Sequence, residues 1–128
     1  MNKLIIDAAH NNIFLMVIGN NFNHNISYEN SKINYEKLTL IIYEFLKSKK
    51  LNLSKISQIY VNRGPGSFAG IRNSLSIVKA INLAKKIDYY CYSFRDFKVE
   101  NKIMYEKIPD LCKKFEIKKN LINPIYSS

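Results

Sequence analysis

The sequence predicts an α/β domain built on a mixed sheet, with a β-meander at the N-terminus and two long helices. Three short runs near the N-terminus, residues 4–6, 13–18 and 22–28, are separated by turn-forming residues and indicate the meander. Over residues 56–92, an apolar run, a glycine-rich turn, a long helical pattern and a second apolar run follow one another. A strand, helix and strand in this order predict a right-handed parallel βαβ unit.

The first long helix is predicted over residues 35–47. Its apolar side chains recur at the three- and four-residue spacing of one helical face, and Ser31 or Asn34 can cap its start. Leu40 and Tyr43 widen the apolar surface beyond the single stripe that a surface helix needs. We therefore expect a second side of this helix to face a partner.

The glycine-rich turn joins the strand at residues 56–62 to the second long helix at residues 68–86. Its motif residues are Arg63, Gly64, Pro65, Gly66, Ser67, Phe68, Gly70 and Arg72. Glycine permits unusual backbone angles, proline stiffens a turn, and serine is a good helix N-cap. The P-loop pattern GxxxxGK[ST] is absent, and Pro65 removes one amide donor. A structural turn with a partner-facing helix behind it is therefore favoured over nucleotide binding at this turn.

The second long helix carries small and apolar residues beside its core stripe, and small residues permit close approach of another helix. Combined with the first helix, this surface gives a candidate partner interface. Its residues are Tyr35, Leu38, Ile42, Asn73, Ser76, Ile77 and Ala80.

Few side chains in the sequence indicate chemistry. Asp7 ends the first strand, which is a ligand-facing position in α/β folds, and it can either serve a nucleotide site or cap a turn. Ser67 does not lie in a GxSxG elbow, and the acidic residues form no paired-carboxylate or metal-ligand cluster. Cys91 and Cys112 lack CxxC spacing and are expected to be reduced core thiols.

The net charge of +10 favours contact with nucleic acid or with an acidic partner. The lysines are scattered in short pairs, however, and joint enrichment in Lys, Asn and Ile also follows from an AT-biased genome.

No apolar run is long enough to span a bilayer, and the N-terminus lacks the features of a signal peptide. We therefore expect a cytoplasmic protein without membrane contact.

The pattern weakens in the last part of the chain. Residues 94–101 read as a connection, Pro109 and Asp110 mark the start of a helix, and Pro124 indicates a turn or an edge segment. We expect one domain over residues 1–97, with a C-terminal helix and tail at residues 98–128 packed on it.

The segment RGPGSFAGIR at residues 63–72 closely resembles the GRGPGSFTGxR segment of the TsaB (YeaZ) family. The opening strand and turn at residues 4–9, the Tyr92-Ser93 pair and the closing residues 123–126 also look like family segments, and the resemblance covers residues 1–97 well. The chain looks like a shortened member that lacks most of the second subdomain. It departs from the family at Ala69, where the family has threonine, and in the opening turn, where Ala8 and His10 replace hydroxyl residues.

The resemblance implies an actin-like (ASKHA, ribonuclease H-like) fold and a non-catalytic scaffold subunit without a cofactor of its own. The family works with the catalytic subunit TsaD, in a complex that makes N6-threonylcarbamoyladenosine next to the anticodon of tRNAs reading codons that begin with A. A TsaE-type ATPase is an expected further partner, a homodimer through the same helices is compatible, and tRNA is expected to be contacted through the complex. Two alternatives remain open: a stand-alone nucleotide-binding remnant of the superfamily with a vestigial site at Asp7, and a basic tRNA-binding module.

Overall fold

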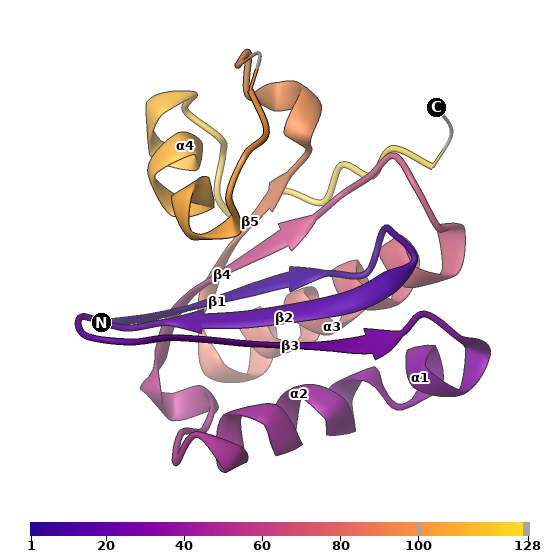
Figure 1. The fold of residues 1–128 in the computed structure, drawn as a ribbon, viewed down its shortest axis with the longest axis vertical. Coiled ribbons are helices and arrows are strands. Elements are labelled where there is room, and N and C mark those ends of the chain that lie inside the picture. The colour runs from indigo at the N-terminus through magenta and orange to yellow at the C-terminus, as the bar shows by residue number, and fades with distance from the viewer. Residues whose placement is uncertain (100, 127–128) are drawn as a thin grey trace.

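The computed structural model describes residues 1–99 and 101–126. Its centre is a five-stranded sheet in the order β3-β2-β1-β4-β5 (Figure 1). The strands are β1 (Asn2–Asp7), β2 (Asn12–Ile18), β3 (Asn23–Glu29), β4 (Ile56–Asn62) and β5 (Asp88–Tyr92). The first three pair antiparallel as a meander, whereas β4 lies parallel to β1 and β5 parallel to β4. The predicted mixed sheet and its βαβ unit are confirmed.

The helices differ from the prediction at one point. They are α1 (Lys32–Glu36), α2 (Leu38–Ser48), α3 (Phe68–Lys85) and α4 (Ile108–Lys114), with 3-10 turns η1 (Leu53–Lys55), η2 (Phe94–Asp96) and η3 (Tyr105–Lys107). The single helix expected at residues 35–47 is two helices, separated at Lys37, whose φ of −99° and ψ of 11° leave the helical range. The first begins earlier than expected because the Ser31 hydroxyl accepts a hydrogen bond from the Asn34 amide at 3.3 Å and caps it.

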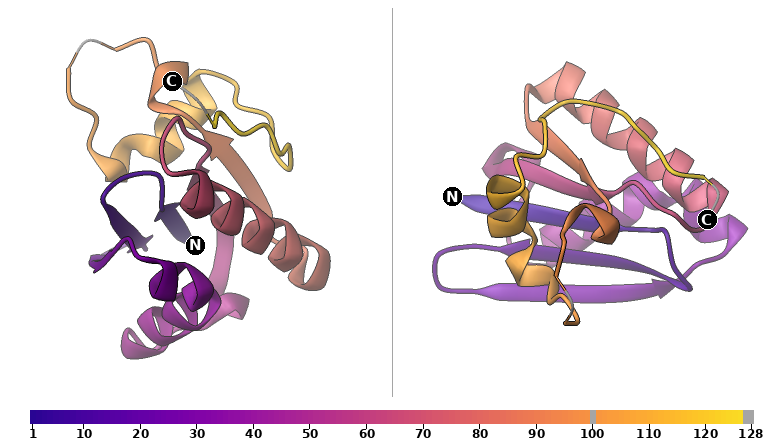
Figure 2. Two further views of the ribbon diagram at one scale, coloured as in Figure 1. Left: turned by 90° about the vertical axis from the view of Figure 1, so that its right-hand side faces the viewer. Right: turned by 90° about the horizontal axis from the view of Figure 1, so that it is seen from above.

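The sheet is covered on both faces (Figure 2). On one face, alternate strand residues such as Leu4, Ile6 and Val61 are fully buried against α1, α2 and α3. The opposite face carries Ile5 and Tyr60, and the segment from residue 94 to residue 117 packs over them. Side chains of neighbouring strand residues point to opposite faces, so the near-continuous apolar runs of β1 and β4 reflect burial on both sides.

The last part of the chain is attached to the sheet at several points. Helix α4 has Pro109 in its first turn, as predicted, and Ile108 and Cys112 are buried against the sheet. The tail then returns to β5, where the Asn120 amide donates to the Tyr89 carbonyl at 2.7 Å. Finally it passes the glycine-rich turn, where the Ile125 amide donates to the Arg63 carbonyl at 2.7 Å.

Candidate functional site

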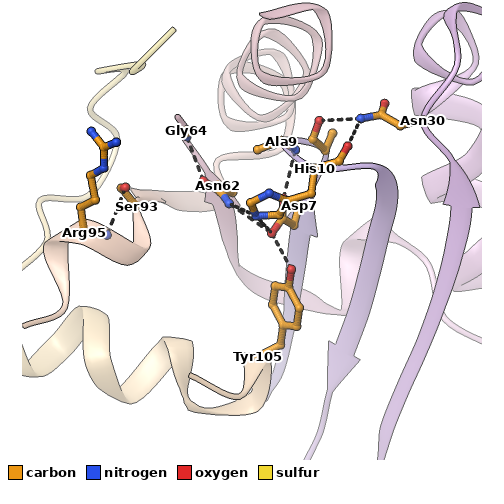
Figure 3. A network of polar contacts seen from close by, with 10 residues as sticks. Asp7, Ala9, His10, Asn30, Asn62, Gly64, Ser93, Arg95 and Tyr105 are labelled. Carbon is orange, nitrogen blue, oxygen red and sulfur yellow. Dashed lines mark hydrogen bonds and ion pairs between the residues drawn. The ribbon is translucent and has the colours of Figure 1, made fainter. Parts of the chain in front are cut away.

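A buried polar network lies where β1 and β4 end, and Asp7 is at its centre (Figure 3). One carboxylate oxygen of Asp7 accepts from the backbone amide of Ala9 at 3.0 Å. The other accepts from Asn62 Nδ2 at 3.1 Å and from the Tyr105 hydroxyl at 2.6 Å. His10 Nε2 lies 3.4 Å from the same oxygen and is half exposed. Asp7, 1% exposed, thus has both oxygens engaged by donors of the protein itself.

Tyr105 joins this network from η3, 98 positions after Asp7 in the sequence. Burial raises the pKa of the Tyr105 hydroxyl, and the nearby Asp7 charge and the hydrogen bond to it raise the pKa further. The hydroxyl therefore stays protonated and keeps donating to the carboxylate across the physiological range. The C-terminal segment thereby supplies a donor that neither the sheet nor the glycine-rich turn provides.

The glycine-rich turn is held by its first residues. Asn62, which also donates to Asp7, accepts from the Gly64 amide at 2.8 Å. The Arg63 guanidinium binds the Asp96 carboxylate of η2 at 2.6 Å and the Asn123 carbonyl at 2.9 Å. Arg63 therefore ties the turn to η2 and to the C-terminal tail.

Two glycines let the start of α3 approach the end of β1. A Cβ atom at Gly66 would overlap the carbonyl oxygen of Ala9, and one at Gly70 would overlap that of Ala8. The Ser67 amide donates to the Ala9 carbonyl at 2.9 Å across this contact. These two glycines are thus required by close packing. Gly64 is required by its φ of 110° and also by close packing, because a Cβ atom there would overlap the carbonyl oxygen of Ile125.

An open hollow of about 500 Å³ lies beside this contact. Ser67 and Tyr35 stand at its edge, with Tyr35 Oη and Ser67 Oγ 2.6 Å apart. The other lining residues are Ala9, His10, Asn11 and Asn30. Ser67 Oγ also accepts from the Gly70 amide at 3.2 Å, as predicted for the cap of α3. Of the remaining motif residues, Phe68 and Arg72 are exposed and Pro65 is partly exposed.

A second hollow, of about 350 Å³, lies between the α1–α2 pair and α3. Four of the seven candidate interface residues line it: Tyr35, Asn73, Ser76 and Ile77, together with Glu36 and Thr39. Ala80 is exposed one turn further along α3. Leu38 and Ile42 offer no surface to a partner, because they are 0% and 2% exposed in the core.

The apolar surface of the α1–α2 pair lies on other residues. Ile33, Leu40 and Tyr43 are 62%, 49% and 54% exposed. Phe68, at the start of α3, is 55% exposed and its ring packs against that of Tyr126. Leu40 and Tyr43, which were expected to widen the apolar surface of the first helix, are thus exposed to solvent. The candidate interface was wrong at Leu38 and Ile42, and a partner on this side of the helix stays a prediction.

In the described part of the chain, the two thiols are buried and no metal-ligand cluster forms. Cys91 and Cys112 are free and buried, and burial raises the pKa of each thiol to about 12. Among residues 1–99 and 101–126, no group of three or more His, Cys, Asp or Glu side chains is placed to hold a metal ion. No helix in that part is long and apolar enough to cross a bilayer.

The chain is similar to known proteins in sequence and in structure. The family model described as "TsaD: tRNA N6-adenosine threonylcarbamoyltransferase" matches residues 28–113. The "tRNA threonylcarbamoyladenosine biosynthesis protein TsaB" of Buchnera aphidicola subsp. Baizongia pistaciae is 28% identical over 86 residues, which are 67% of this chain and 39% of that protein.

Solved structures agree on the fold. YeaZ from Pseudomonas aeruginosa has a TM-score of 0.66 at 18% identity, over 72% of this chain and 43% of its own. RuvC of Thermus thermophilus, solved with a Holliday junction substrate, has a TM-score of 0.53 at 14% identity, over 77% of this chain and 68% of its own. The fold is thus of the actin-like, ribonuclease H-like α/β type. The chain spans about two fifths of the length of the TsaB and YeaZ relatives it matches. The chain belongs to the TsaD family, whose model matches two thirds of it, and the relatives that it resembles in sequence and in fold are TsaB and YeaZ.

Proposed function

We propose that this chain is a non-catalytic TsaB-type scaffold that binds a TsaD-type catalytic subunit and holds it in a competent state. The complex would form N6-threonylcarbamoyladenosine next to the anticodon of tRNAs that read codons beginning with A. The name of the Buchnera relative and the description of the matching family model support this pathway. A TsaE-type ATPase would join the complex, tRNA would be contacted through it, and the protein would work in the cytoplasm.

The observation that carries the proposal is the surface along α1, α2 and α3. The hollow between these helices has a wall of small and polar residues on α3, namely Asn73 and Ser76, which permits a partner helix to approach closely. Exposed Leu40 and Tyr43 on α2 supply apolar area beside it. Apolar anchors next to a concave surface are typical of protein interfaces. Because TsaB and TsaD share a fold, a second copy of the chain can use the same surface.

The Asp7 network supports a scaffold role. In a nucleotide site at this position, the carboxylate would have to face the ligand or its metal. Here both oxygens of Asp7 are engaged by Ala9, Asn62 and Tyr105. A ligand would have to displace the 2.6 Å hydrogen bond from Tyr105, and loss of a hydrogen bond to a charged group costs about 1.5–3 kcal/mol.

The test is co-expression with the TsaD-type subunit of the same organism, followed by size-exclusion chromatography. We expect a stable mixed complex with the wild-type chain and none with Ser76→Glu combined with Ala80→Glu, because both positions are exposed on α3 beside the hollow. The matched control is Asn25→Glu combined with Ser27→Glu, which adds the same charge at exposed positions of β3 and should leave the complex intact. A folded wild-type chain that forms no complex would refute the scaffold role.

A stand-alone nucleotide-binding role is the second candidate, and the hollow of about 500 Å³ at the start of α3 favours it. A helix N-terminus beside an open hollow attracts anions. Isothermal titration of the isolated chain with ATP and Mg²⁺ separates the two functions. Heat of binding that is lost in a Ser67→Ala variant would favour the nucleotide role, and no heat would favour the scaffold.

A further inference from the structure

Between Phe45 and Ile87 the sequence contains nine Lys or Arg residues and no Asp or Glu. The whole chain has ten acidic residues among 128, so a stretch of this length would carry about three at the average density. A general enrichment in lysine leaves acidic residues interspersed, whereas this stretch excludes them. The overall enrichment in lysine therefore does not explain why this stretch lacks acidic residues.

The fold gathers many of these lysines at one end. Helices α2 and α3 both finish on the side of the sheet where β4 and β5 begin, at the lower left of Figure 1. A hollow of about 420 Å³ joins η1 and the start of β4 to Lys85 and Lys86. The C-terminal tail reaches the same end, because Asn120 bonds to the start of β5. We call the exposed cluster the lysine end; it comprises Lys49, Lys50, Lys55, Lys85, Lys86 and Lys118.

The lysine end is not neutralised by the described residues. None of its six ammonium groups lies within 4.0 Å of a carboxylate of residues 1–99 and 101–126. Asp88, at the start of β5, is already held by Lys119 at 3.6 Å and by Asn120 Nδ2 at 2.9 Å. Cations near helix C-termini stabilise the helix, which accounts for Lys85. That account does not extend to Lys55 in η1 or to Lys118 in the tail.

The composition of the surface favours a nucleic acid over a membrane. In the two segments that carry the lysine end, residues 45–87 and 118–121, the exposed large apolar side chains are Phe68, at the opposite end of α3, Leu83 and Leu121. Binding to a lipid surface uses several apolar side chains inserted together. Clustered lysines on a polar surface match the regularly spaced phosphates of a nucleic acid.

We propose that the lysine end is an electrostatic docking surface for the phosphate backbone of RNA. The choice of RNA, and of tRNA as its form, rests on the proposed function. The surface lies at the amino ends of β4 and β5, whereas the hollow between α1 and α3 lies beside residues 35–39 and 73–77. The chain therefore offers a partner subunit and an RNA separate surfaces.

The test is fluorescence anisotropy of the full chain with a labelled, unmodified tRNA transcript, over salt concentrations from about 50 to 200 mM. If all six lysines contact phosphates, affinity should fall roughly 1,000-fold over that range. A variant with Lys49, Lys55, Lys85 and Lys118 each changed to Gln keeps two contacts, and its affinity should fall only roughly tenfold. It should also bind more weakly than the wild type at the lowest salt.

The matched control changes Lys32, Lys37, Lys98 and Lys102 to Gln, which removes the same charge at exposed positions elsewhere. Equal losses in both variants would show that net charge alone matters and would overturn the proposal. No binding by the wild-type chain at low salt, or binding to phosphatidylserine vesicles in place of tRNA, would overturn it too. Because the partner test uses other residues, a failure of tRNA binding leaves the scaffold role standing. A failure of the partner test would remove the reason for choosing tRNA, but it would not change the salt dependence measured here.

Discussion

The two faces of the sheet are covered in different ways. One face lies under α1, α2 and α3, whose apolar stripes repeat at helical spacing, and it contains the larger core cluster. The other lies under residues 94–117, whose described residues form one seven-residue helix and two 3-10 turns. Aromatic rings replace helical packing there: Phe97 stacks on Tyr92 at a centroid distance of 5.9 Å, and Phe14 on Tyr105 at 4.1 Å.

The difference shows how a short segment can complete a domain. A sheet with an apolar face must bury that face against another element, and α4 with its flanking turns covers it with buried residues such as Phe97 and Ile108. The segment also contributes Tyr105 to the Asp7 network, which lies where β1 and β4 end. We propose that residues 1–97 and 98–128 form one cooperative unit.

Matched truncations in the two faces give the largest expected effect. Phe45, a residue of α2 in the helix-covered cluster, is 2% exposed, and Phe97, in the other cluster, is 3% exposed. Phe45→Ala and Phe97→Ala should each lower the free energy of unfolding by about 3–5 kcal/mol, because each leaves a cavity in a packed core. Urea unfolding followed by tyrosine fluorescence and by circular dichroism should give coincident transitions. A separate early transition for Phe97→Ala would show that the second face is a loosely attached layer.

The close approach of α3 to β1 occurs on the sheet face that α1, α2 and α3 cover. Gly70→Ala would place a methyl group against the Ala8 carbonyl, and we expect a loss of about 3 kcal/mol. The neighbouring Ala69 is exposed, and Ala69→Gly should cost only about 1 kcal/mol through helix propensity. Thermal unfolding of the two variants compares them, and equal stabilities would contradict the packing role of Gly70.

The sequence predicted the helical face better than the other one. Strand alternation and helical periodicity are local patterns, and the glycine-rich turn marks its own position, so β1 to β5 and α3 lie where expected. Leu38 and Ile42 show the limit of periodicity, because it identifies an apolar helix without showing which side faces its own core. The exposed side consists instead of Leu40 and Tyr43, whose excess over one stripe was visible.

The Asp7 network was only half predictable. Asp7 follows from its place at the end of the first strand, and Asn62 ends β4, the parallel neighbour of that strand. Tyr105 lies in a segment without periodicity, and its pairing with Asp7 over 98 positions depends on how the chain folds back. The Arg63–Asp96 ion pair has the same character, since neither residue indicates the other in the sequence.

The hydrogen bond between Asp7 and Tyr105 links the second face to the edge of the sheet. Tyr105→Phe should lower stability by about 2 kcal/mol, because the carboxylate loses a buried donor. In a double-mutant cycle with Asp7→Asn, the loss from Tyr105→Phe should shrink by about 1 kcal/mol. Tyr43→Phe at an exposed position is the control and should be nearly neutral. Additive losses in the cycle would mean that the two residues do not interact.

The two thiols test both faces at once, because Cys91 lies in the helix-covered cluster and Cys112 in the other. Burial raises the pKa of each to about 12 in the folded protein, above its ordinary value of about 8.5 when unfolded. Above pH 9 or so, the unfolded chain loses thiol protons that the native chain keeps, so stability falls as pH rises. The slope should approach roughly 1 kcal/mol per pH unit for each thiol.

Urea midpoints measured between about pH 8 and pH 10.5 test this slope, and below about pH 8 neither thiol should contribute. Cys91→Ala and Cys112→Ala should each remove their own share of it. If only Cys91→Ala changed the slope, the second face would be open to solvent in the native state.

Substitutions at the end of α3 should change stability least, and they separate the effect on stability from the effect on tRNA binding. Lys86 adopts a left-handed conformation with φ of 57°, whereas Lys85 is the last residue of the helix. Lys86→Gly should therefore stabilise the protein by roughly 0.5 kcal/mol, because glycine adopts that conformation without a Cβ penalty. Lys85→Gly should destabilise it by up to about 1 kcal/mol. Both variants lose one charge from the lysine end and should weaken tRNA binding equally. Binding that followed stability rather than charge would assign the lysines to helix termination alone.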